Sequence, residues 1–275
     1  MKIAVHQMCG GIDPERNCAD MVDAVYQSSG QGAVMYFAPE MSLLLDRDRE
    51  RARKHIVDES AVIGLKRLAG VAKDAGIWIH IGSIPVLHES NGKFANRTLV
   101  IAPDGEIRAR YDKMHLFDVD LSSGESWRES AAYNGGDGPV AVATPLGLMG
   151  LTICYDLRFP NLYAALIEAT VDVIAVPAAF TVPTGKAHWH TLLRARAIEA
   201  EAFVIAAAQS GLHEDGRQTY GHSLVVDPWG EILLDMGDGE GLAFAELDLN
   251  RISEARAQIP VHKNRREISM TVRRY

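Results

Sequence analysis

The sequence lacks the features of several protein classes. Cysteine is scarce, because the 275 residues include only Cys9, Cys18 and Cys154. An odd, small number in a long chain does not suit a disulfide framework, and we expect a reducing, cytoplasmic setting. No apolar run reaches the roughly 18 residues that a transmembrane helix needs, and the first residues show no signal-peptide pattern. These absences predict a soluble chain that binds no membrane.

An excess of positive charge is also absent. The chain has 36 acidic residues against 28 Lys and Arg, for a net charge of −8. This balance argues against nucleic acid or an anionic membrane as the main partner. We interpret the basic clusters at residues 47–54 and 265–274 as solvated faces or subunit contacts.

Apolar residues make up 47% of the chain, enough for a substantial core in one large domain or two small ones. Their patterns predict strands at residues 2–8, 33–38, 77–86, 172–177, 203–209 and 242–247, and helices at 13–29, 59–75, 161–169, 187–202 and 249–258. Hairpins are predicted at residues 97–111, 140–153 and 222–235. Strands apolar on both faces suit covered sheets. Because hairpins interrupt the helix–strand alternation, we expect a layered α/β fold, with two mixed sheets and outer helices.

Cys154 lies where a predicted buried strand changes abruptly into a polar turn. Residues 149–153 are mostly apolar, and Pro160 opens a helical segment soon afterwards. A cysteine at such a bend can present its thiol to a cleft, beside backbone N–H groups that can meet an anion. The alternative is a small buried hydrophobe, the commonest role of a free cysteine.

Two glutamates and a lysine are further candidates. Glu40 follows the apolar segment 34–38, where burial of an unpaired carboxylate is costly. We expect a raised pKa there, as suits a general base, although a helix cap or a surface salt bridge fits equally well. Lys113 ends a hairpin strand, and Glu129 follows a loop rich in Ser and Gly. Neither position alone indicates a function.

Histidine and glycine patterns do not indicate a bound group. His188 and His190 are two residues apart on a predicted helix, so they lie on different sides and cannot chelate one ion together. His115 has no second ligand at a metal-like spacing. Residues 135–138 are Gly-rich but match neither the dinucleotide nor the P-loop pattern, and we interpret them as a turn. We therefore expect no metal.

Three motifs in this order resemble the nitrilase superfamily of carbon–nitrogen hydrolases. They are Phe-Ala-Pro-Glu at 37–40, Tyr-Asp-Lys-Met-His-Leu-Phe at 111–117, and Ile-Cys-Tyr-Asp-Leu-Arg-Phe-Pro at 153–160. The resemblance implies a catalytic triad of Glu40, Lys113 and Cys154, with Glu129 supporting Lys113. It also implies an oxyanion hole formed by Lys113 and the backbone N–H of Tyr155. With nucleophile, base and oxyanion site all supplied by the protein, no cofactor is needed.

The same resemblance implies a fold and an assembly. The likeness covers nearly the whole chain, so residues 1–275 are expected to form one four-layer α-β-β-α sandwich, with residues 261–275 as a C-terminal tail. Members of the superfamily pair through their helical layers, which implies a homodimer or a higher homo-oligomer.

Four further segments, at 178–189, 192–199, 206–211 and 220–230, resemble the branch that contains the deaminated glutathione amidases. The resemblance implies substrate contacts from Arg158, Phe180 and Thr184, with the Arg158 guanidinium binding a carboxylate. The segment from Phe180 to Lys186 is expected to be a loop.

The expected reaction is hydrolysis of a small amide through a thioester on Cys154. Deaminated glutathione, split to 2-oxoglutarate and cysteinylglycine, is the first expected substrate. An omega-amidase acting on 2-oxoglutaramate or 2-oxosuccinamate is the alternative. A third hypothesis is a non-catalytic scaffold that keeps the fold to bind partners.

Overall fold

The computed structural model describes the whole chain except residues 89–91, 121–123, 125, 267–271 and 274–275. Most of the strands are short. They are β1 Lys2–Gln7, β2 Met35–Phe37, β3 Trp78–His80, β4 Ile84–Leu87, β5 Phe94–Ile101, β6 Ile107–Asp112, β7 Asp118–Asp120, β8 Ser126–Arg128, β9 Val140–Thr144, β10 Gly147–Leu151, β11 Val173–Ala175, β12 Phe203–Ala206, β13 Ser210–Leu212, β14 Gln218–Tyr220, β15 Leu224–Val226, β16 Ile232–Asp235 and β17 Gly241–Glu246. The helices are α1 Pro14–Gly30, α2 Arg49–Arg53, α3 Ile63–Ala75, α4 Pro160–Glu168, α5 Val182–Ala200, α6 Asn250–Gln258 and α7 Val261–Asn264, with 3-10 turns η1 Glu59–Ala61, η2 Glu129–Ala131 and η3 Cys154–Arg158.

Two large mixed sheets share one design. The first runs β17-β1-β2-β3-β5-β4, with β6 paired to β5, and the second runs β16-β15-β12-β11-β10-β9. In each sheet three parallel strands, β1-β2-β3 or β10-β11-β12, are flanked by antiparallel partners. The parallel strands are joined through helices, and the antiparallel strands are mostly joined as hairpins. The expectation of two mixed sheets is confirmed.

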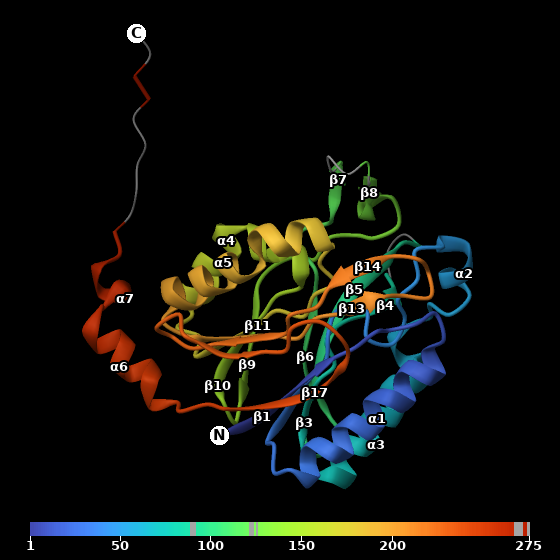
Figure 1. Ribbon diagram of the computed structural model, residues 1–275, viewed down its shortest axis with the longest axis horizontal. Helices are drawn as coiled ribbons and strands as arrows, with labels where there is room; N and C mark the ends of the chain where they lie inside the picture. The colour runs from blue at the N-terminus through green and yellow to red at the C-terminus, as the bar shows by residue number, and fades with distance from the viewer. Residues whose placement is uncertain (89–91, 121–123, 125, 267–271, 274–275) are drawn as a thin grey trace.

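The sheets lie face to face between two layers of helices, as Figure 1 shows. One apolar core joins their inner faces and contains residues of both sheets, such as Ile3, Phe37, Leu151 and Ile174. A second core lies between the outer face of the first sheet and the pair α1 and α3, where Met21 and Leu68 are fully buried. Helices α4 and α5 cover the outer face of the second sheet. The layers therefore follow the order α-β-β-α.

Local chemistry explains why the helices begin where they do. The Asp13 carboxylate accepts a hydrogen bond from the N–H of Glu15 at 3.0 Å, and Pro14 occupies the first turn of α1. In α5, Pro183 lies in the first turn and the N–H of Gly185 donates to the Thr181 carbonyl at 2.8 Å. Helix α5 thus starts at Val182 rather than at the predicted residue 187. The loop expected from Phe180 to Lys186 is wrong, because Thr-Val-Pro-Thr is itself a helix-start pattern.

Other predicted elements are interrupted. The helix expected over residues 59–75 is a 3-10 turn, an extended Val62 and then α3. The strand expected over 77–86 is divided into β3 and β4, because Gly82 adopts φ +71° between them. The irregular tail expected from residue 261 is wrong for its first residues, which form α7 after Pro260. Residues 267–271 and 274–275 of that tail lie outside the described part of the chain.

The carboxyl ends of the parallel strands meet at one end of the molecule. Glu40 follows β2, Cys154 follows β10, and Phe180 follows β11. In open α/β sheets, ligands bind beyond these ends of the strands.

No helix in the described part of the chain is long and apolar enough to cross a membrane.

Candidate active site

Cys154 lies on a strained turn at the end of β10. Its φ is +49°, a left-handed conformation that non-glycine residues rarely adopt. The backbone N–H of Cys154 donates to the Pro177 carbonyl at 2.9 Å, so the turn is tied to the neighbouring strand. Pro160 then opens α4. The sharp bend predicted from the sequence is confirmed.

The carboxylate of Asp156 holds this turn in place. It is fully buried and accepts hydrogen bonds from the N–H of Ile153 at 2.9 Å and from the Tyr111 hydroxyl at 2.6 Å. It also lies 2.7 Å from Nδ1 of His115, whose ring stacks on Phe159. The sequence singled out His115 only as a metal ligand to reject, and it did not identify Asp156 as the anchor of the turn.

Glu40 lies between the two sheets with both carboxylate oxygens bonded. Oε1 accepts from Lys113 Nζ and from Asn96 Nδ2, each at 2.9 Å. Oε2 accepts from the N–H of Ala179 at 3.0 Å, and the carboxylate hydrogen-bonds to the Cys154 thiol. Asn96 and Ala179 lie 56 and 139 positions from Glu40, so no local pattern predicted these contacts.

Lys113 joins the two glutamates. Its Nζ donates to Glu40 at 2.9 Å and to the two oxygens of Glu129 at 3.2 and 2.9 Å. Its N–H donates to the Asn96 carbonyl, and its own carbonyl accepts from the N–H of Gly136, both at 2.9 Å. A Cβ at Gly136 would lie 2.1 Å from the Asp112 carbonyl oxygen. The Gly-rich segment 135–138 therefore packs against the strand that carries Lys113.

The charges of this group shift one another's pKa. Burial raises the pKa of Glu40, but the Lys113 ammonium and hydrogen bonds from Cys154, Lys113 and Asn96 outweigh it, so the pKa is lowered. The raised pKa expected for Glu40 is therefore wrong, since that argument considered burial without the paired ammonium. Burial lowers the pKa of Lys113, but Glu129 and Glu40 raise it well above the ordinary value.

For the Cys154 thiol, the effects of burial and of the neighbouring charges on the pKa balance in the opposite direction. Burial and the nearby Glu40 carboxylate raise its pKa well above the ordinary value, and Lys113 only partly opposes them. The thiol is consequently protonated at neutral pH, and it needs a base within reach to become a nucleophile. Glu40, which accepts its hydrogen bond, is such a base.

One cavity of about 1090 Å³ is lined by all the residues expected to act in catalysis or to contact substrate. They are Glu40, Lys113, Glu129, Cys154, Tyr155, Arg158, Phe180 and Thr184. The Arg158 guanidinium lies 5.5 Å from the centre of the Phe180 ring and 3.2 Å from Nδ1 of His188. Within the part of the chain that the structure describes, Arg158 has no carboxylate partner. It is therefore available to bind a carboxylate of a ligand.

Charged residues of both signs line the cavity beside α2. Arg47 and Arg49, from the cluster interpreted as a solvated face or a subunit contact, line it together with Asp46, Asp48 and Glu50. The Asp48 carboxylate caps α2, which carries this cluster, by accepting from two backbone N–H groups at 3.1 Å. Arg47, Arg49, Arg53 and Lys54 are exposed, as a solvated face implies, and Arg47 and Arg49 also line the cavity.

Comparisons with known proteins agree with this geometry. The family model described as carbon-nitrogen hydrolase matches residues 2–257. A bovine protein named deaminated glutathione amidase is 37% identical over 96% of this chain and 81% of its own length. A Synechocystis protein of the same name is 40% identical over 95% of this chain and 97% of its own.

A solved structure shares the architecture. Nit3 of Saccharomyces cerevisiae, described as a member of branch 10 of the nitrilase superfamily, superposes with a TM-score of 0.86 at 27% identity. The match covers 97% of each chain. With the family model spanning most of its length, this chain belongs to the carbon–nitrogen hydrolase family of the nitrilase superfamily, and it is an enzyme that hydrolyses carbon–nitrogen bonds.

Proposed function

We propose that this enzyme hydrolyses the amide bond of deaminated glutathione, releasing 2-oxoglutarate and cysteinylglycine. The observation that carries the chemistry is the meeting of the Cys154 thiol, the Glu40 carboxylate and the Lys113 ammonium at one wall of the cavity. The names of the bovine and Synechocystis relatives support the choice of substrate.

The reaction begins when Glu40 takes the proton of the Cys154 thiol as the sulfur attacks the amide carbonyl carbon. The developing oxyanion is stabilised by Lys113 and the backbone N–H of Tyr155. One such donor typically contributes about 3 kcal/mol to lowering the barrier. Protonated Glu40 then gives its proton to the leaving nitrogen as the C–N bond breaks, which leaves a thioester on Cys154.

A water molecule completes the cycle. Glu40 takes a proton from it as its oxygen attacks the thioester, and collapse of the second tetrahedral intermediate breaks the C–S bond. The acid leaves and Cys154 regains its proton. Glu129 keeps Lys113 charged and directed toward Glu40, as its hydrogen bonds of 2.9 and 3.2 Å support. The nucleophile, the base and the oxyanion donors are all groups of the protein, so the proposed cycle needs no cofactor.

Two features of the cavity fit a substrate with a carboxylate at each end. Arg158 lies near Phe180 and Thr184, where it would bind the carboxylate of the 2-oxo acid. Arg47 and Arg49, which line the same cavity, suit the carboxylate of the glycine residue. A cavity of about 1090 Å³ also exceeds what 2-oxoglutaramate would fill.

The test is a turnover assay with deaminated glutathione and 2-oxoglutaramate measured side by side. We expect a higher kcat/KM for the peptide-bearing substrate, and a loss of at least about 10⁴-fold in Cys154→Ala. Equal or reversed preference would make the chain an omega-amidase. Turnover by neither wild type nor variant, with Cys154 unreactive toward an electrophile in folded protein, would favour a non-catalytic scaffold.

The proposal also covers the cellular location, the domain organisation and the oligomeric state. Three free cysteines support a reducing, cytoplasmic location, and a core shared by both sheets supports one domain over residues 1–275 with a tail at 261–275. An apolar groove between α4, α5 and α6, lined by Ile198, Trp229 and Ile259, supports a homodimer formed through this helical layer.

A further inference from the structure

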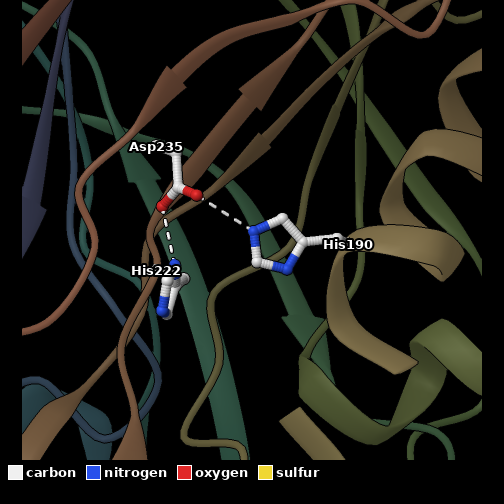
Figure 2. Close-up of side chains that lie close together, drawn as sticks. All are labelled: His190, His222 and Asp235. Atoms are coloured by element: carbon white, nitrogen blue, oxygen red, sulfur yellow. Dashed lines mark hydrogen bonds and ion pairs between the residues drawn. The ribbon is translucent and has the colours of Figure 1, made fainter. Parts of the chain in front are cut away.

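Three metal-binding side chains from distant parts of the sequence meet beside α5. His190 lies on α5, His222 precedes β15, and Asp235 ends β16. Figure 2 shows the Asp235 carboxylate between the two imidazole rings, with each oxygen directed at one ring. Oδ2 lies 3.0 Å from His190 Nε2, and Oδ1 lies 2.9 Å from His222 Nδ1.

The spacing suits a single small ion. One ligand atom from each residue can be chosen so that all three lie within 4.8 Å of one another. Bonds of about 2.1 Å in a tetrahedral site place ligand atoms about 3.4 Å apart, so only small side-chain rotations separate this group from that geometry. All three side chains are partly exposed, which leaves room for water on the remaining position.

The charge around Asp235 also favours a cation. Two other carboxylates of the enzyme are paired with arginine, Asp172 with Arg256 and Asp227 with Arg251. Within the described part of the chain, Asp235 has only the two imidazoles as ion-pair partners. A second carboxylate, Asp238, lies 3.9 Å from His222 Nε2 and is almost fully exposed.

The backbone holds the group in place from several sides. His222 adopts φ +53°, its N–H donates to the Gly237 carbonyl at 2.8 Å, and its carbonyl accepts from Trp189 Nε1 at 2.8 Å. The N–H of Gly237 also donates to Asp235 at 2.9 Å. Ligands fixed in this way lose little freedom when they bind an ion.

We propose that His190, His222 and Asp235 bind a divalent transition-metal ion such as Zn²⁺. Two imidazole nitrogens and one carboxylate oxygen form the protein ligands, and water completes the coordination. None of the three residues lines the catalytic cavity, and the ion takes no part in the hydrolysis. It fastens α5, which carries Thr184 of the cavity, to the β15–β16 hairpin.

The test is a titration with Co²⁺ and with Zn²⁺ in a Cys154→Ala background, because a thiol is itself a zinc ligand. We expect one ion bound per chain, visible-region absorption typical of tetrahedral Co²⁺, and a higher melting temperature with Zn²⁺. His190→Gln and Asp235→Asn should each weaken binding by at least about 10-fold, since even residues behind the ligands contribute 10- to 100-fold. Circular dichroism checks that each variant is folded.

The matched control is His188→Gln, which removes a histidine from the same helix two residues away. Its ring faces Arg158 rather than Asp235, so the affinity for Zn²⁺ should stay within about twofold of the parent's. Affinity unchanged in His190→Gln and Asp235→Asn, or no saturable binding in the parent, would overturn the proposal. A sulfur-to-cobalt charge-transfer band would do so too, since it would place the ion on Cys9 or Cys18.

Discussion

At the scale of single residues, the cavity wall is one connected charge network. Lys113 is shared by Glu40 and Glu129, and Glu40 in turn accepts the hydrogen bond of the Cys154 thiol. Removing one member of a buried pair leaves an uncompensated charge, which is costly. The network therefore keeps Glu40 ionised, Lys113 charged and the Cys154 thiol neutral.

These ionisation states predict that kcat/KM changes little with pH near neutrality. The pKa of Glu40 is held below its ordinary 4.5, so the base is lost only as the pH falls below that value. The pKa values of Cys154 and Lys113 lie well above 9.0 and 10.5, so the active form persists as the pH rises. We expect kcat/KM to vary less than about twofold between about pH 5.5 and 8. A limb with an apparent pKa near 7 would contradict the lowered pKa of Glu40.

Asp156 is predicted to be more important for stability than its distance from the chemistry suggests. In Asp156→Asn, an amide that carries N–H donors replaces a carboxylate that accepts from Ile153, Tyr111 and His115. Bonds to a buried charge contribute about 1.5–3 kcal/mol, and we expect the free energy of unfolding to fall by about that amount. Denaturant unfolding measures it.

The control for this substitution is Asp120→Asn. Asp120 is likewise a hydrogen-bonded carboxylate, paired with Arg128, but both side chains are exposed. We expect a change below about 0.5 kcal/mol. Equal effects of the two substitutions would mean that the Asp156 network does not stabilise the turn of Cys154.

At the scale of elements, the break between β3 and β4 sets the position of Glu40. Gly82 adopts φ +71°, and a Cβ there would lie 1.8 Å from the carbonyl oxygen of Pro39, the residue before Glu40. In Gly82→Ala the backbone must move. We expect the free energy of unfolding to fall by about 2–5 kcal/mol, from left-handed strain together with overpacking. We also expect kcat/KM to fall about 100-fold, because the base is displaced.

Gly32→Ala provides the matched control. Gly32 also has a left-handed φ, +78°, but nothing lies within 4 Å of a Cβ built there. Only the strain of about 1–2 kcal/mol should remain, with kcat/KM unchanged. If both variants keep full activity, the contact of Gly82 with Pro39 does not position Glu40.

Sequence patterns predicted the helices and strands better than they predicted contacts between residues far apart in the sequence. The hairpins and most helices lie within a few residues of their predicted bounds, since their periodicity and turn residues are local signals. Helix α2 was missed because it is a short run without an apolar face. The lowered pKa of Glu40 depends on Lys113, 73 positions away, and the partners of His190 lie 32 and 45 positions away. No spacing rule relates residues so distant.

The proposed catalytic residues were predicted from a different kind of signal. Glu40, Lys113 and Cys154 each had an ordinary structural explanation, and only their order in three motifs resembled a family. Glu40 meets Asn96 on β5 and Ala179 beyond β11 because the topology brings these segments of the two sheets together.

At the scale of the whole molecule, the two sheets are built alike and the site lies where their strands end. Each contributes a parallel β-α-β-α-β unit; Glu40, the proposed base, comes from the first, and Cys154, the proposed nucleophile, comes from the second. Neither half contains a complete site. The face-to-face packing of the sheets is therefore required both for the core and for bringing Glu40 to Cys154.

The two outer helical layers differ in a way that predicts which one forms the dimer. Ile198 on α5 is 48% exposed and lines an apolar groove with Trp229, whereas Ile63 on α3 is 69% exposed outside that groove. Ile198→Glu would place a charge in the proposed interface, so we expect sedimentation to show monomers. Ile63→Glu, the same substitution on the opposite layer, should leave dimers. Dissociation by Ile63→Glu alone would mean that α1 and α3 form the interface, and monomeric wild-type enzyme would mean that each chain works alone.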